Sequence, residues 1–109
     1  VIESPFKANK EHTEEEHVAY ARECLYDSLM RGEAPFASHL LYPQVLDDNI
    51  PEERTLGIDC QLEYIQASEY ICVYMDMGLS SGMIQAIQYA STEGTPIRFR
   101  QVEFRRESH

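Results

Sequence analysis

A run of apolar residues that ends in an acid and a Gly/Ser turn constrains the fold of this 109-residue chain more than any other feature. Residues 70–75 are mostly β-branched or aromatic, which is typical of a buried parallel strand. Asp76 follows the run, and Ser80 or Ser81 begins a helix that we expect to extend to about Ser91. A strand that turns directly into a helix predicts an α/β domain.

The same alternation of strand and helix patterns continues along the chain. Thr13 and Glu16 form a capping box at the start of a helix, Gly32 ends that helix, and Pro51 suits the first turn of another. The expected strands are 1–4, 34–37, 70–75 and 97–100, the third helix covers about 82–90, and residues 40–50 form a loop. This order predicts a parallel three-layer sandwich in one domain over residues 1–109.

Charge and composition exclude several classes of function. The net charge of −10 argues against a nucleic-acid partner, since that binding depends on Lys and Arg. There is no apolar run of membrane-spanning length and no signal peptide, so we expect a cytoplasmic protein with no membrane partner. Cys24, Cys60 and Cys72 form no CxxC pair or Cys/His cluster. We therefore expect free thiols, no metal and no cofactor.

Polar and aromatic residues follow the expected strands at their carboxyl ends, where α/β sheets bind ligands. Asp76 can hold a ribose hydroxyl or a base edge, or it can simply cap the turn that follows it. The N–H groups at the start of the third helix can receive an anion or a hydroxyl. We expect Arg100 near the same crevice, and assign no role to His17 on a polar helix face. The ligand-binding candidates are Ser4, Pro5, Phe6, Ser38, His39, Asp76, Ser80, Ser81, Gly82 and Met83.

Short segments in a particular order carry a family resemblance. They are Ser4-Pro5-Phe6, Ala37-Ser38-His39-Leu40-Leu41-Tyr42-Pro43, Leu46-Asp47-Asp48, Pro51-Glu52-Glu53-Arg54, Leu56-Gly57, Asp76, Ser81-Gly82-Met83, Ala90 and Gly94-Thr95-Pro96-Ile97. On these segments the chain resembles the nucleoside 2-deoxyribosyltransferase-like superfamily, in particular a small branch common in phages and bacteria. The resemblance implies a Rossmann-like (flavodoxin-like) fold with a mostly parallel sheet of four or five strands. It also implies oligomers and a ligand with a ribosyl or deoxyribosyl unit.

The residues at the reacting centre differ from those of the transferases that the chain resembles. Those enzymes use a glutamate one helical turn after the position of Gly82, and this chain has Ala86 there. Phe6 stands where they tend to have a tyrosine, and Gln61 where many relatives have an acid. Since the covalent step needs a carboxylate, the sequence predicts no glycosyl transfer between nucleosides.

Two functions remain open. The first is binding of a nucleotide or another compound with a ribosyl unit. A phage protein with this function could sequester a nucleotide signal of host defence. The second is an N-glycosidase or deoxyribosyltransferase-type enzyme. In one form of this enzyme, Asp76 or Glu3 activates water. In the other, the ancestral nucleophile at the position of Ala86 has been lost, either naturally or by engineering.

We also expect a homo-oligomer. The last strand alternates, so one of its sides faces solvent or a partner. Tyr42, Tyr64 and Tyr89 are suitable aromatic anchors for an interface.

Overall fold

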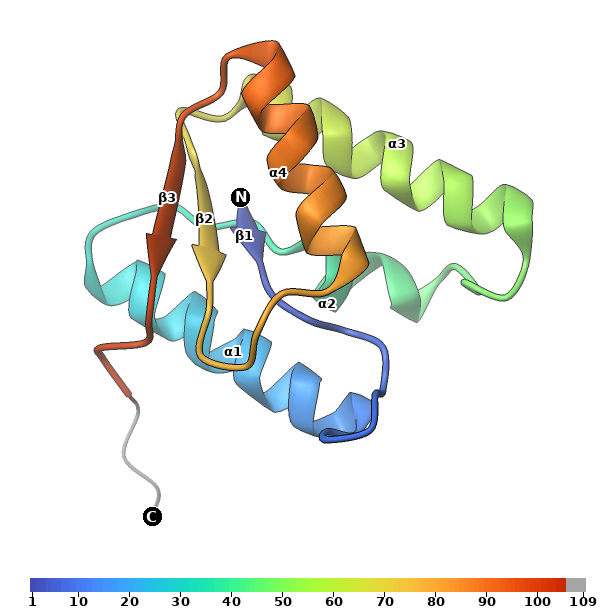
Figure 1. The fold of residues 1–109 in the computed structure, drawn as a ribbon, viewed down its shortest axis with the longest axis horizontal. Helices are drawn as coiled ribbons and strands as arrows, with labels where there is room; N and C mark the ends of the chain where they lie inside the picture. The colour runs from blue at the N-terminus through green and yellow to red at the C-terminus, as the bar shows by residue number, and fades with distance from the viewer. Residues whose placement is uncertain (106–109) are drawn as a thin grey trace.

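The computed structural model describes residues 1–105 and contains a parallel sheet flanked by helices (Figure 1). The elements are β1 (Ile2–Glu3), α1 (Glu14–Met30), α2 (Ser38–Leu41), a 3₁₀ turn η1 (Tyr42–Gln44), α3 (Pro51–Ala67), β2 (Ile71–Tyr74), α4 (Ser81–Glu93) and β3 (Ile97–Arg100). The sheet order is β1-β2-β3, with both pairs parallel. The α/β class and the parallel sheet are thus confirmed.

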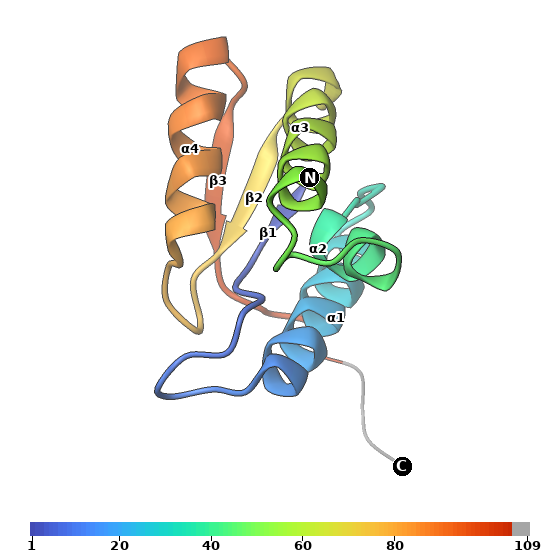
Figure 2. The ribbon, with the colours of Figure 1, turned by 90° about the vertical axis from the view of Figure 1, so that its right-hand side faces the viewer.

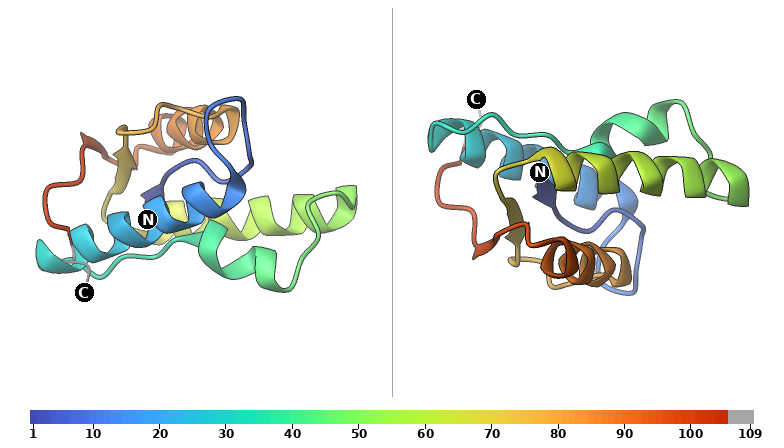
Figure 3. Two further views of the ribbon diagram at one scale, coloured as in Figure 1. Left: turned by 90° about the horizontal axis from the view of Figure 1, so that it is seen from below. Right: turned by 90° about the horizontal axis from the view of Figure 1, so that it is seen from above.

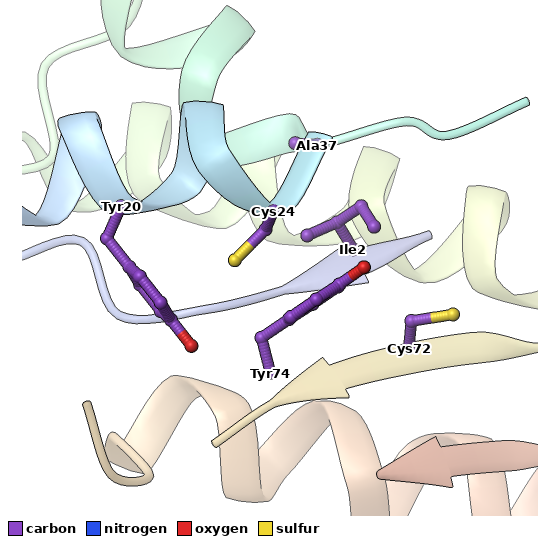
Figure 4. Close-up of a cluster of buried hydrophobic side chains, with 6 residues drawn as sticks. All are labelled: Ile2, Tyr20, Cys24, Ala37, Cys72 and Tyr74. Atoms are coloured by element: carbon purple, nitrogen blue, oxygen red, sulfur yellow. The ribbon is translucent and has the colours of Figure 1, made fainter. Parts of the chain in front are cut away.

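The central strand β2 is buried on both faces, as its apolar run predicts. Ile71 and Val73 pack against α3 and α4, whereas Cys72 and Tyr74 pack against α1. Figure 2 shows α1 and α4 on opposite sides of the sheet, and the end-on views of Figure 3 show the same layers. In Figure 4, Tyr74 and Cys24 point toward each other between β2 and α1. Helices therefore cover both faces of the sheet.

The helix ends follow the predicted capping residues. Thr13 Oγ1 accepts a hydrogen bond from the Glu16 N–H at 3.1 Å, and the Glu16 carboxylate accepts one from the Thr13 N–H at 3.2 Å. The capping box at the start of α1 is therefore confirmed. Ser80 caps α4, and Gly94 ends it at φ 78°, in the left-handed region that glycine adopts most easily.

The expected strand at residues 34–37 is wrong, and the described residues contain three strands instead of four or five. The segment lies beside β1, where the Ile2 N–H donates to the Phe36 carbonyl at 2.8 Å. Pro35 has no N–H to extend a ladder, and β1 has only two residues. Ala37 is already the N-cap of α2. The expected loop at 40–50 likewise contains the end of α2 and the η1 turn.

A network of polar side chains joins α1 to β2 and β3 on the face opposite α4. Arg100 donates two hydrogen bonds to Glu33, at 2.7 and 3.0 Å, and a third to the Tyr74 hydroxyl at 3.3 Å. The Tyr74 hydroxyl donates to the buried Asp27 carboxylate at 2.5 Å. Each charge of this network therefore has a partner, and the edge strand β3 is held to the body of the domain.

The thiols and the helices have two further properties. Cys24 and Cys72 are buried free thiols in the layer between α1 and the sheet, and Cys60 is a half-buried free thiol on α3. Within residues 1–105, none of the helices combines the length and the apolar character needed to cross a membrane.

Candidate functional site

A cavity of about 530 Å³ opens at the carboxyl ends of β1 and β2. The loop after β1 and the start of α4 meet at this end of the sheet (Figure 1), and α2 and α3 supply the remaining walls. Apolar side chains cover much of the surface: Pro5, Phe6, Pro43, Leu46, Ile58, Leu62, Leu79 and Met83. The volume and the mixed lining are those of a small-molecule site.

The structure brings most of the predicted ligand-binding residues to this cavity. Those that line it are Ser4, Pro5, Phe6, Ser38, His39, Ser80, Ser81, Gly82 and Met83. Ala86, at the position expected for a nucleophile, also lines it and is 3% exposed. Asp76 and Arg100 are absent from the lining.

Asp76 holds neighbouring parts of the fold together. Its Oδ2 accepts a hydrogen bond from the Tyr20 hydroxyl at 2.5 Å and another from the Val102 N–H at 3.0 Å. The Asp76 N–H in turn donates to the Tyr20 hydroxyl at 3.0 Å. The carboxylate thus joins α1 and the segment after β3 to the turn that follows β2. Arg100 is held by Glu33, away from the cavity lining.

Ser4 and His39 form one hydrogen-bonded pair in the cavity wall. Ser4 Oγ lies 2.6 Å from His39 Nε2, and Ser4 is 6% exposed. Desolvation lowers the pKa of His39 to about 4, so its imidazole is neutral near pH 7. The pair therefore offers hydrogen bonds to a ligand without adding charge.

Glu3 and Gln61 form a second pair, contributed by β1 and α3. Gln61 Nε2 donates a hydrogen bond to Glu3 Oε2, and both residues line the cavity. Glu3 is only 4% exposed. Desolvation raises the pKa of Glu3 to about 7, although the hydrogen bond from Gln61 and the Val1 amine oppose that rise. A carboxyl group that titrates near neutrality inside a cavity is typical of a functional site.

The start of α4 differs in one respect from the expected anion site. Ser80 Oγ accepts the Met83 N–H at 3.2 Å, so that N–H is already satisfied within the helix cap. The N–H groups of Ser81 and Gly82 belong to the first turn, where an α-helix provides no internal acceptor. The N–H groups that can face a ligand are therefore those of Ser81 and Gly82.

The charged groups at the cavity have both signs. Lys7 and Arg54 contribute positive charge. Asp48 and the buried Glu3 are the acidic residues of the lining. Among residues 1–105, no group of three or more His, Cys, Asp or Glu side chains has the arrangement of a metal site.

A family model described as "Domain of unknown function (DUF7768)" matches residues 1–100, and so includes every residue of the cavity. The chain belongs to the DUF7768 family. No curated protein and no solved structure matches it.

In this DUF7768 domain, the two hydrogen-bonded pairs occupy consecutive positions of one strand end. Glu3 pairs with α3 and Ser4 with α2, so both pairs border the same cavity. The sequence marked Ser4 and His39 as ligand contacts, but it marked Glu3 only as an alternative activator of water. The signal that could have found it is an acid in the last position of an otherwise apolar strand.

Proposed function

We propose that this domain binds a nucleotide or another small molecule with a ribosyl unit in the cavity at the strand ends. The observation that carries the proposal is a cavity of about 530 Å³ that combines apolar walls with two part-buried hydrogen-bonding pairs. Apolar and aromatic walls suit a nucleobase, and the pairs suit sugar hydroxyls. The Ser81 and Gly82 N–H groups suit a phosphate.

The resemblance of the sequence to the nucleoside 2-deoxyribosyltransferase-like superfamily supports the same ligand class. The cavity lies where a Rossmann-like (flavodoxin-like) sheet binds its ligands, outside the carboxyl ends of the strands. Ala86 lies in the cavity wall with a methyl group in place of a carboxylate. Binding without glycosyl transfer is the function that this wall supports best.

A direct test separates binding from catalysis. Purified protein is incubated with nucleosides, nucleoside monophosphates, cyclic dinucleotides and ADP-ribose, then filtered, and the retained and free fractions are chromatographed. The expected result is retention of at least one compound, which heat releases unchanged. Failure to retain any of these compounds would refute the proposal.

The buried Glu3 favours a second candidate function, hydrolysis of an N-glycosidic bond. With its pKa raised to about 7, the Glu3 carboxylate can take a proton from a water molecule. The water oxygen then bonds to the anomeric carbon while the carbon–nitrogen bond breaks, and the departing base takes a proton from solvent. Release of a free base in the incubation above, lost in Glu3→Gln, would establish this function instead.

A further inference from the structure

The Glu3–Gln61 pair presents two hydrogen-bond acceptors at the cavity. An ionised Glu3 can receive only the NH₂ group of Gln61, so the Gln61 carbonyl oxygen is left for another partner. Glu3 Oε1 and Gln61 Oε1 accept no hydrogen bond from the described residues, and neither is completely sealed from solvent. Both residues line the cavity.

Two neighbouring acceptors are complementary to two neighbouring donors. In a ribosyl unit those donors are the adjacent 2′- and 3′-hydroxyl groups, and an acidic residue near a strand end is a common partner of a ribose hydroxyl. We propose that Glu3 and Gln61 together bind this pair of hydroxyl groups and so select ribosyl over 2-deoxyribosyl ligands. This inference rests on the proposed function, because it assigns a substrate class to the same cavity.

The burial of Glu3 determines how strongly the pair discriminates. Glu3 is 4% exposed, so little water can replace a missing ligand hydroxyl. A site built to hydrogen-bond a hydroxyl rejects the analogue that lacks it, because buried polar atoms are then left unpaired. We expect the ribosyl compound to bind at least about 10-fold more tightly than its 2-deoxy counterpart.

The same contact couples binding to pH. Hydroxyl donors stabilise the carboxylate, so a bound ribosyl unit lowers the pKa of Glu3 from about 7. The charged or titratable groups around the pair are the Val1 amine, His39 of α2, and Lys7, Tyr42, Asp48 and Arg54 at the cavity. The part of α4 that lines the cavity carries no charged side chain. Below pH 7, binding should release a proton and weaken by up to about 10-fold per pH unit.

The experiment compares matched pairs of probes by isothermal titration calorimetry at pH 8. The probes are AMP, GMP, CMP and UMP, each against its 2′-deoxy form. The expected result is that at least one ribonucleotide binds at least about 10-fold more tightly than its counterpart. Titration of that ribonucleotide at pH 6 in two buffers of different ionisation enthalpy should show proton release.

Variants test whether the Glu3–Gln61 pair causes the preference for ribosyl over 2-deoxyribosyl ligands. Glu3→Gln should reduce the ribo/deoxy affinity ratio to about 2-fold and lower the proton release to the part that comes from the ligand phosphate, whose second pKa is about 6. Gln66→Ala is the matched control, since Gln66 is exposed on the same helix as Gln61 and outside the cavity lining. It should keep the wild-type ratio. Circular dichroism checks that both variants are folded.

The outcomes separate the two proposals. Equal binding of ribo and deoxy forms would overturn the role of the pair and leave the ribosyl site standing. A ratio that persists in folded Glu3→Gln would also overturn the role of the pair. If neither these probes nor the wider panel binds, the proposed function and this inference both fail.

Discussion

Replacing Glu3 by Gln should stabilise the protein, by an amount that depends on pH. Glu3 has an ordinary pKa of 4.5 when unfolded and one of about 7 when buried in the fold. Each pKa unit corresponds to about 1.36 kcal/mol, so ionised Glu3 lowers the free energy of unfolding by about 3 kcal/mol above pH 7. Glutamine has nearly the same shape and no charge to desolvate.

The direction of this pH dependence depends on whether the folded or the unfolded state binds the Glu3 proton more tightly. Because the folded state raises the pKa, Glu3 is neutral in both states below pH 4.5 and costs nothing there. As pH rises from 4.5 to about 7, the unfolded state ionises first and wild-type stability falls relative to Glu3→Gln. Above about pH 8, where Glu3 is ionised in both states, the difference between the two proteins is constant.

The measurement is urea unfolding followed by circular dichroism at half-unit steps from pH 5.5 to 8.5, a range that avoids precipitation near the isoelectric point of about 4.7. Over this range Glu3→Gln should gain about 2 kcal/mol relative to wild type, most of it below pH 7. Thr55→Ala, an exposed change on α3, is the control and should show a pH-independent difference. A Glu3→Gln difference that is equally flat would refute the burial argument.

Three other predictions follow from the structure. Glu33→Gln should lower the free energy of unfolding by about 3 kcal/mol at pH 7, because the hydrogen bonds from Arg100 lower the pKa of Glu33 to about 2. In urea titrations that loss should be smaller near pH 3, well below the isoelectric point, than at pH 7. Ala86→Glu should produce detectable release of free base from a bound nucleotide by chromatography, and no release from a folded variant would contradict a relic transferase site. Light scattering at micromolar concentration should give a multiple of 12.6 kDa, and a 12.6 kDa monomer would contradict the expected homo-oligomer.

The parts of the fold that the sequence predicted depend on local physics. Thr13, Glu16 and Ser80 act within one turn of their own helix, so their roles are visible from spacing alone. The missing strand at 34–37 depended on distant structure. An extended apolar segment joins a sheet only when its neighbour provides a long enough edge, and β1 provides two residues.

The difference between local and distant contacts also explains which site residues were predicted correctly. Residues that follow strands were expected at one edge, and most of the candidates line one cavity there. Asp76 instead bonds to Tyr20, 56 residues away, and that partner cannot be found from spacing. His17, which was expected on a polar face, is fully buried, with Nδ1 3.3 Å from the Phe6 carbonyl oxygen. Both differences arise from how α1 packs on distant parts of the domain, the turn after β2 and the loop after β1.

The position of the buried carboxylate connects stability to function in this domain. Of the two acids that line the cavity, Glu3 is buried and Asp48 is partly exposed. A buried, ionisable Glu3 lowers stability near neutral pH, and a glutamine there would remove that cost. Stability alone would favour the neutral side chain, so the buried carboxyl group is the feature of the cavity that the proposed binding or hydrolysis best explains. Ala86, which also lines the cavity, provides no carboxylate. Chemistry or recognition by a carboxylate in this cavity therefore depends first on Glu3.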